Sequence, residues 1–172
     1  MSQFILEFEI PLKDLHDRIT HAKSLNTSVN NTELINSLES QLLREKNNIY
    51  SNLNRWQKVE IARHPMRPHS SDYISNITSE WIEIHGDRKY SDDKAIITGF
   101  GMIDNIKCAI IGQEKGRTTK EKLKHNFGMS KPEGYRKALR LMKLAEKFNL
   151  PVISFIDTPG AYPGIGAEER GQ

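Results

Sequence analysis

The first third of the chain carries apolar residues at helical spacing. Over residues 11–23 they predict one short amphipathic helix, with Pro11 suited to its first turn. A polar connector over residues 26–31 follows, and a second, longer helix is predicted from Thr32. Its apolar stripe is narrow, is interrupted by Glu45, and consists of Ile35, Leu38, Leu42, Ile49, Leu53, Trp56 and Val59. We expect the two helices to form an antiparallel hairpin that packs on a neighbouring body, with a low-grade coiled coil as the alternative.

Prolines end this helical region. Residues 63–68 have the sequence RHPMRP, and neither a proline nor the residue before it fits a helix interior. We place a domain boundary here, after an N-terminal helical segment of residues 1–62. A further helix is predicted to start at an N-cap Ser71 or Asp72 and to stop at Gly86. Its apolar residues are Tyr73, Ile77, Trp81 and Ile84, and a charged loop follows it.

The second half of the chain mixes strand and helix patterns. Two apolar runs, residues 95–103 and 106–112, flank Asp104-Asn105, which predicts a two-residue β-hairpin. Residues 113–129 are basic and irregular, and an amphipathic helix begins at Pro132. Its predicted apolar face consists of Tyr135, Ala138, Leu139, Met142, Ala145 and Phe148. The opposite, basic face consists of Arg136, Lys137, Arg140, Lys143 and Lys147.

A short apolar run over residues 152–156 predicts a buried strand after this helix. A strand, a crossover that contains a helix, and a second strand form a parallel unit of right-handed connection, so a mixed α/β sheet is expected. Ligands of such sheets bind outside the carboxyl ends of the strands. Those ends are residues 113–117 and 157–160, which we therefore expect at one edge of the sheet.

Glycine-rich residues 160–166 join the last strand to a helix start at Ala167. This layout presents backbone N–H groups to an anionic ligand atom. Neither common phosphate fingerprint fits, because no Gly-Lys-Ser/Thr occurs and Glu169 stands where a dinucleotide site needs glycine. A plain glycine-rich turn is the alternative. Asp157 suits a general base or, more often, the first residue of an Asx-type turn. No serine or cysteine nucleophile has a histidine nearby, so an oxyanion hole of backbone amides stays open.

The composition is that of an ordinary soluble globular chain: 172 residues, 37% hydrophobic and 27% charged. No run approaches the ~20 apolar residues of a membrane span. Glu7 and Glu9, with no basic segment before them, argue against a signal peptide. The one cysteine, Cys108, cannot form an internal disulfide or a cysteine-based zinc site, and its apolar neighbours predict a buried strand thiol. We expect no metal site and a reducing, cytoplasmic location.

The net charge of +3 conceals an uneven distribution. Residues 107–147 carry twelve Lys or Arg and four Asp or Glu, a balance of +8, so the rest of the chain carries −5. This concentration is typical of a protein with a polyanionic partner, such as nucleic acid, a membrane surface or a phosphate-rich small molecule. A solvated helix face is the alternative. Proximity to a strand end favours ligand binding by Lys115, Arg117, Lys120 and Lys124.

Several long motifs resemble one known family. FIDTPGAYPGIGAEERGQ, preceded by NFGMSKPEGYRKALRLMKLAEKF, closely resembles the carboxyltransferase alpha-subunit family of bacterial acetyl-CoA carboxylases. ARHPMRP, HGDR, SDDKAIITG and LEFEIPLKDL are similar to further landmarks of that family, in register from Leu6 to Gln172. The resemblance implies an α/β fold of the crotonase-like (ClpP/crotonase) type, a ββα superhelix that is incomplete here and is preceded by the N-terminal helical hairpin. Residues 63–172 would be the first part of a CoA carboxyltransferase C-terminal-type domain, truncated after Gln172.

The resemblance also implies a function. The family transfers the carboxyl group of carboxybiotin, carried on the biotin carboxyl carrier protein, to acetyl-CoA and so gives malonyl-CoA for fatty acid biosynthesis. The implied partners are a zinc-ribbon-bearing beta subunit in an alpha2beta2 heterotetramer, the carrier protein and biotin carboxylase, with no membrane. Biotin would not be bound covalently to this chain, and this subunit would hold no metal.

The implied site has two parts. A biotin pocket would be lined by Gly160, Ala161, Gly164, Ile165 and Gly166, and a basic loop would consist of Lys115, Gly116 and Arg117. The transfer creates an anionic ureido oxygen and an enolate, which need preorganised N–H donors. The family's Gly-Gly donors lie in a later strand–loop–helix unit, expected beyond Gln172. No catalytic residue is therefore assignable within this chain, and the chain alone is expected to be inactive.

Two other functions stay open. The chain could be an α/β module that binds RNA or a phosphate-rich ligand through residues 107–147. It could also be a structural assembly subunit whose helices over residues 12–60 form the interaction surface.

Overall fold

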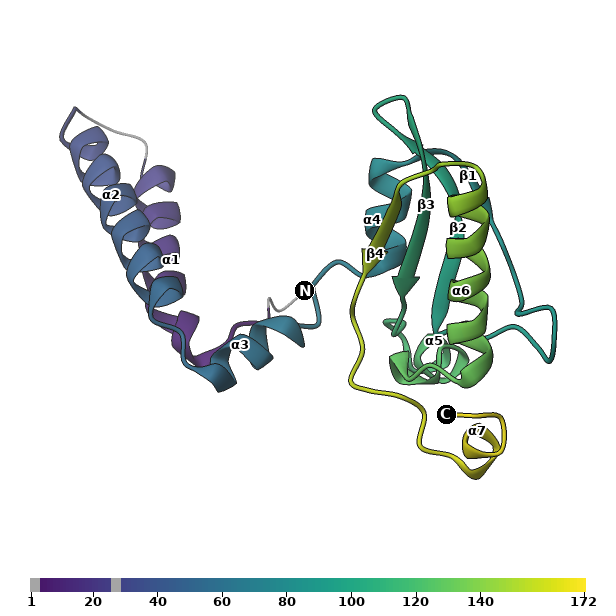
Figure 1. Cartoon of the computed structure of the whole chain (residues 1–172). Helices are drawn as coiled ribbons and strands as arrows, with labels where there is room; N and C mark the ends of the chain where they lie inside the picture. The colour runs from purple at the N-terminus through teal and green to yellow at the C-terminus, as the bar shows by residue number, and fades with distance from the viewer. Residues whose placement is uncertain (1–3, 26–28) are drawn as a thin grey trace. The chain divides into compact units, whose positions relative to one another are not determined.

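The computed structural model describes residues 4–25 and 29–172, and the chain divides into two compact units, Met1–Arg67 and Pro68–Gln172 (Figure 1). The predicted domain boundary lies between residues 62 and 63, and this division lies between residues 67 and 68. The assignment of the two segments to domains stays a prediction. Within the described ranges, no helix combines the length and the apolar character that a bilayer crossing requires.

The first unit begins with a helical hairpin. A short 3-10 turn, η1 (Glu7–Glu9), leads into α1 (Ile10–Ser24), and α2 (Val29–Ser51) follows. Of the polar connector predicted over residues 26–31, residues 26–28 lie outside the described residues. The remainder already belongs to α2.

The two long helices of this unit lie side by side (Figure 1). Leu15 and Ile19 of α1 are buried against Leu38 of α2. The helices are antiparallel, because Tyr50, near the end of α2, donates a hydrogen bond to Glu9, just before the start of α1. The predicted hairpin is confirmed.

The prediction of one unbroken helix up to Val59 is wrong, because α3 (Arg55–Ala62) is a separate helix. Asn54 is extended and forms a reciprocal cap with Gln57: each backbone N–H donates to the other side chain at 2.9 Å. The cap satisfies N–H groups that a continuous helix would bond internally. Trp56, placed on the apolar stripe by its spacing, is 64% exposed.

The second unit is a four-stranded sheet between helices (Figure 1). The strand order is β1-β2-β3-β4, in which β3 and β4 are parallel and the other neighbours are antiparallel. The elements are α4 (Ser70–Ile77), β1 (Ser79–Glu83), β2 (Ile96–Ile103), β3 (Ile106–Gln113), α6 (Pro132–Lys147) and β4 (Val152–Phe155). The predicted hairpin is confirmed, since Asp104 and Asn105 have φ of 45° and 66°, as a tight two-residue turn requires.

The helix predicted to extend to Gly86 is wrong, because it ends at Ile77 and β1 follows. Its N-cap is His69 rather than Ser71 or Asp72. Trp81 belongs to β1, and its ring lies against the backbone of Gly99 in β2, where a Cβ would come within 2.5 Å of the ring. The helical spacing of Trp81 was coincidental, because its packing partner is a strand glycine.

The two faces of the sheet carry different helices, α4 on one and α6 on the other (Figure 1). Cys108 and Ile110 of β3 are buried with Ile74 of α4, which confirms the predicted buried thiol. Ala109 and Ile111 point to the opposite face, and the core there consists of Ile96, Ala109, Ile111, Ala138, Leu141 and Ala145.

The predicted apolar face of α6 is only partly the buried one. Ala138 and Ala145 are buried as expected, but Tyr135, Leu139, Met142 and Phe148 are exposed. Lys137, predicted on the solvent face, is 1% exposed. Its ammonium group lies 2.6 Å from a carboxylate oxygen of Asp92 and donates to the carbonyl of Asp93 at 2.7 Å, which compensates its burial.

Two further predictions near the end of the chain are corrected. β4 is not a buried strand: Val152 is 42% exposed, and Ile156, just after it, is 85% exposed. The reason is that β4 is an outermost strand of the sheet, with β3 as its one neighbour among the described strands. The basic segment of residues 113–129 is not irregular throughout, because it contains α5 (Thr119–Lys124) and a 3-10 turn, η2 (Asn126–Gly128).

The charged loop before β2, residues 87–93, is held to α6 by ion pairs. Asp87 has a fully buried carboxylate, which accepts N–H groups of Lys89 and Tyr90 at 3.0 and 2.8 Å and lies 2.8 Å from Arg136. Burial alone would raise the pKa of Asp87, but these hydrogen bonds and the Arg136 guanidinium outweigh it and lower the pKa to about 2.

Asp87→Asn should lower the free energy of unfolding by about 2–3 kcal/mol near neutral pH, because asparagine leaves Arg136 without its partner. The folded pKa of Asp87 lies below its usual 3.8, so its contribution is complete above about pH 5 and is lost as the pH falls towards about 2. Urea unfolding followed by circular dichroism at several pH values should show a weaker acid dependence in the variant. Asp104→Asn, the same change in the exposed turn, is the control. Parallel pH curves for wild type and Asp87→Asn would contradict this account.

Candidate functional site

The carboxyl ends of the parallel strands β3 and β4 meet at one edge of the sheet. Just after the ladder, Asp157 donates its backbone N–H to the side-chain oxygen of Gln113 at 3.0 Å. The ammonium nitrogen of Lys115 lies 2.6 Å from Oδ1 of Asp157. The prediction that residues 113–117 and residues 157–160 lie at one edge is confirmed. From here on, the basic loop denotes residues 113–117, which include the predicted Lys115, Gly116 and Arg117. We call residues 157–166 the glycine loop.

The basic loop makes a sharp turn at Gly116. Its φ is 74°, and a Cβ at this position would lie 2.5 Å from the carbonyl carbon of Glu121, so only glycine fits. Arg117 donates to both carboxylate oxygens of Asp72 at 3.0 and 2.5 Å. Of the two basic residues of the loop, Lys115 therefore faces the glycine loop, and Arg117 is held by α4.

Lys120 and Lys124, also favoured as ligand-binding residues by the sequence, lie on the exposed surface of α5. Neither forms an ion pair with an acid of the described residues. The structure does not join them to the Lys115 side chain or to the glycine loop.

Glu114 is an acid of the basic loop that sequence reasoning did not single out. It is 3% exposed, and its carboxylate accepts the backbone N–H groups of Ser71 at 3.1 Å and Gly116 at 2.9 Å. His69 Nδ1 lies 2.8 Å from it. Burial alone would raise the pKa of Glu114, but hydrogen bonds from Ser71, Gly116 and His69 outweigh it and lower the pKa to about 2. The ionised carboxylate thus joins the start of α4 to the basic loop.

The glycine loop is shaped by Thr158 rather than by the Asx-type turn considered for Asp157, whose carboxylate faces Lys115 instead. The hydroxyl of Thr158 accepts the N–H of Gly160 at 3.1 Å and lies 2.6 Å from the carbonyl oxygen of Gly128. Further along, Tyr162 donates its N–H to the carbonyl of Ser130 at 3.0 Å. These contacts hold the loop against the end of η2 and against the segment between η2 and α6.

The last helix, α7 (Ile165–Glu168), begins two residues before the predicted start at Ala167. It has only one turn, so its dipole is too weak to define an anion site by itself. None of the five residues predicted to line a biotin pocket is fully buried. Ala161 and Ile165 are exposed, whereas Gly160, Gly164 and Gly166 are half-buried.

Arg170 lies four residues after the glycine loop and fixes the loop's C-terminal end. Its guanidinium donates to both carboxylate oxygens of Glu133 at 3.1 Å and lies 4.3 Å from the centre of the Tyr90 ring. Its carbonyl accepts a hydrogen bond from Arg136 at 3.1 Å. A bidentate pair and a cation–π contact hold this end of the loop to α6 and to the charged loop before β2.

The edge offers anion binding rather than side-chain nucleophilic chemistry. It presents one ammonium group, one carboxylate and the backbone N–H groups of a glycine-rich loop. Among the described residues, no group of three or more His, Cys, Asp or Glu is placed to hold a metal ion. An arrangement of this kind can stabilise a developing negative charge through its N–H donors.

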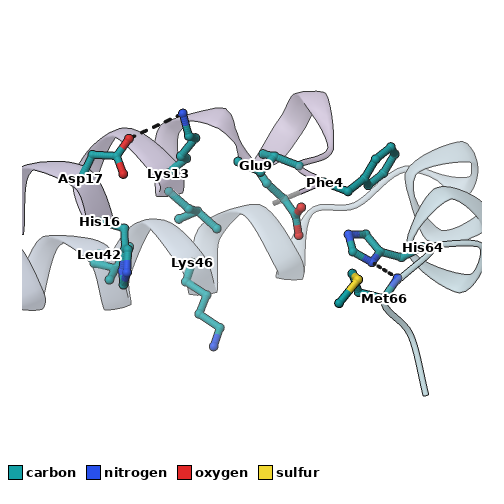
Figure 2. Close-up of a pocket in the computed structure, with 11 residues that line it drawn as sticks. Phe4, Glu9, Lys13, His16, Asp17, Leu42, Lys46, His64 and Met66 are labelled. Atoms are coloured by element: carbon teal, nitrogen blue, oxygen red, sulfur yellow. Dashed lines mark hydrogen bonds and ion pairs between the residues drawn. The ribbon is translucent and has the colours of Figure 1, made fainter. Parts of the chain in front are cut away.

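Among the described residues, cavities lie elsewhere in both units. The first unit holds one of about 530 Å³ between η1, α1 and α2, and Figure 2 shows Phe4, Leu42, His64 and Met66 around it. The second unit holds one of about 380 Å³ beside β2 and one of about 480 Å³ along α6. None of these cavities is lined by residues of the basic loop or the glycine loop.

Comparison with known proteins gives one consistent family. Residues 5–172 match the family model described as acetyl co-enzyme A carboxylase carboxyltransferase-like. The chain is 50% identical over 171 residues to the acetyl-coenzyme A carboxylase carboxyl transferase subunit alpha of Syntrophotalea carbinolica, covering 99% of this chain and 54% of that protein. It is 54% identical over 179 residues to the same subunit of Pseudoalteromonas atlantica, covering 100% and 55%. The chain therefore spans about half the length of these relatives.

A solved structure gives the fold. Transcarboxylase 12S, crystallised with hydrolysed methylmalonyl-coenzyme A, matches 63% of this chain and 19% of its own with a TM-score of 0.50 and 19% identity. At that identity the likeness shows the fold alone. The predicted family and the predicted crotonase-like α/β fold are both confirmed.

Arg170→Lys should loosen the glycine loop, because lysine cannot form the bidentate pair with Glu133 or stack on Tyr90. Hydrogen exchange measured by mass spectrometry should become about tenfold or more faster in residues 160–168, for a loss of about 1.4 kcal/mol of local stability. Exchange in β2 and β3 should not change. Arg44→Lys on the exposed surface of α2 is the control, and equal exchange in both variants would exclude Arg170 as the anchor.

Proposed function

Because this chain belongs to the acetyl co-enzyme A carboxylase carboxyltransferase-like family, we propose that it is part of the alpha subunit of an acetyl-CoA carboxylase carboxyltransferase. The subunit transfers the carboxyl group of carboxybiotin to acetyl-CoA, and malonyl-CoA is formed for fatty acid biosynthesis. The observation that carries the proposal is the match of residues 5–172 to the family, together with identities of 50% and 54% to alpha subunits.

The chemistry of the sheet edge supports this reaction. Carboxyl transfer needs a pocket for a neutral ring system and hydrogen-bond donors where negative charge develops. Ala161 and Ile165 expose apolar side chains on the glycine loop, which fit a neutral bicyclic ring. Carboxybiotin supplies the carboxyl group when it is bound. The ammonium group of Lys115 lies at the same edge, 2.6 Å from the Asp157 carboxylate, so the transferred carboxylate would compete with Asp157 for it.

The remaining partners are part of the same proposal. We propose that the chain acts with a beta subunit in an alpha2beta2 assembly, and with the biotin carboxyl carrier protein and biotin carboxylase, in the cytoplasm. Exposed apolar residues support association with further protein. Tyr135, Leu139 and Met142 on α6, and Ile156 after β4, would otherwise contact water. The helical hairpin of the first unit is proposed as a subunit contact.

Gly164→Val should lower the rate of carboxyl transfer on the order of tenfold to 100-fold, since a side chain there overlaps the Tyr162 ring and displaces the loop. The affinity for the CoA substrate should change little. The assay is decarboxylation of malonyl-CoA in the presence of biotin, with the full-length alpha subunit and its beta subunit. Ser40→Val on α2 is the control. An inactive wild-type complex would overturn the proposed function, and an unchanged rate for the variant would remove the glycine loop from the site.

Binding of a phosphate-rich ligand is the second candidate function, and one observation favours it. The cavity of about 480 Å³ along α6 is lined by five basic side chains, Lys89, Arg136, Arg140, Lys143 and Lys147. Asp87 is the one acid among its lining residues, and it is buried against Arg136. Two leucines form the apolar part of this lining.

If the α6 cavity binds RNA, the affinity for a single-stranded oligonucleotide should fall steeply with salt, because each phosphate contact releases a counterion. A Lys143→Glu, Lys147→Glu double variant should reduce both the affinity and the salt slope. Lys120→Glu, Lys124→Glu on α5 is the matched control. Fluorescence anisotropy at several salt concentrations measures both quantities, and equal losses in the two double variants would assign the binding to net charge instead of the cavity.

A further inference from the structure

Lys115 depends on its neighbours for its direction. It is the basic residue of its loop whose ammonium group reaches the glycine loop, 2.6 Å from Asp157. Its side chain is only 24% exposed, so most of it packs against protein rather than extending into bulk water. A long lysine side chain has about 2 kcal/mol of rotamer freedom to lose. Such a residue holds one direction only where the backbone that carries it is fixed.

Glu114 provides that fixed backbone. Its side chain accepts the backbone N–H of Gly116 at 2.9 Å, so this hydrogen bond closes a tight turn around Lys115. Its own N–H donates to the carbonyl of Ala95 at 2.9 Å, which extends the β2–β3 pairing by one step. Lys115 is therefore the tip of a turn whose two sides are joined by one carboxylate.

The same carboxylate is anchored to a second element. Its other oxygen accepts the N–H of Ser71 at 3.1 Å, in the first turn of α4. His69 Nδ1 lies 2.8 Å away and must carry a proton there, because an ionised carboxylate can only accept a hydrogen bond. Glu114 is thus held by α4, and the basic loop is held by Glu114.

We propose that Glu114 is a positioning residue of the carboxyltransferase site, which holds Lys115 against Asp157 at the carboxyl ends of β3 and β4. This inference rests on the proposed function for its catalytic consequence but not for its structural part. The side chain of Glu114 does not reach the glycine loop itself, and its hydrogen bonds are with His69 and Ser71 at the start of α4 and with Gly116 of the basic loop. It acts through Lys115.

The structural part is tested on the purified chain by the reactivity of lysine amines with an acylating reagent, read out by mass spectrometry. Asp157→Asn should raise the acylation of Lys115 severalfold, because it removes the ion pair. Glu114→Ala should raise it by a similar factor although Asp157 is intact. Glu114→Gln should give an intermediate rise, since its single oxygen can keep Gly116 but cannot also accept from Ser71. Acylation of Lys120 is the internal reference, and Glu146→Ala on the exposed side of α6 is the matched control.

The catalytic part is tested in the assembled complex of full-length alpha and beta subunits. Glu114→Gln should lower kcat about tenfold with little change in KM for the CoA substrate, as expected for a displaced positioning group. Unchanged Lys115 acylation in both Glu114 variants, with a rise in Asp157→Asn, would overturn the proposal. No rise in Asp157→Asn would overturn it as well, since Lys115 would then not be held.

An active complex whose kcat is unaffected by Glu114→Gln would overturn the catalytic role. A wild-type complex without activity would overturn the proposed function, while the acylation ratios would still decide whether Glu114 holds Lys115.

Discussion

The parallel pairing of β3 with β4 is the contact on which the rest of the second unit depends. Their register places Gly112 opposite Phe155, so the segments that follow the two strands leave the sheet side by side. Everything proposed for the site follows from that geometry, because residues more than 40 positions apart become neighbours. The pairing itself needs α6, whose small residues Ala138 and Ala145 let the crossover helix lie close to the sheet.

Charge pairs then fix what the backbone brings together. Lys137 is buried against the loop before β2, and Arg136 is bonded to Asp87 in the same loop. Arg136 also reaches the carbonyl of Arg170, so the loop before β2, α6 and the end of the glycine loop form one connected set. Removing one member of a buried pair leaves the other without compensation, so substitutions of Asp87 or Lys137 should destabilise the second unit more than substitutions of exposed charged residues.

The sequence predicted those parts of the fold that depend on local pattern. The hairpin turn at Asp104-Asn105, the parallel crossover and the shared edge of residues 113–117 and 157–160 are all present. It failed where tertiary partners decide. Trp81 has helical spacing but packs on a strand glycine, and Lys137 has a solvent-facing pattern but finds an acid 45 residues away.

The site was predicted less completely, for a related reason. Lys115 and the glycine loop were named from motif and position, whereas Glu114 and Arg170 were not. An acid just after a buried strand looks like the first residue of a surface loop in sequence. Only the backbone N–H groups that converge on it, from Ser71 and Gly116, distinguish it from a solvated one. Backbone donors leave no trace in residue type, so no periodicity or composition argument could have found them.

The uneven charge of the chain has a simpler explanation than a polyanionic partner. Four of the twelve basic residues in residues 107–147 pair with acids outside that segment. These pairs are Lys115–Asp157, Arg117–Asp72, Arg136–Asp87 and Lys137–Asp92. Part of the segment's net charge of +8 is therefore neutralised, within the folded chain, by acids that contribute to the remainder's net charge of −5. The charge left over lies mainly on α5 and along the outer side of α6, so polyanion binding, where it occurs, belongs to those surfaces and not to the sheet edge.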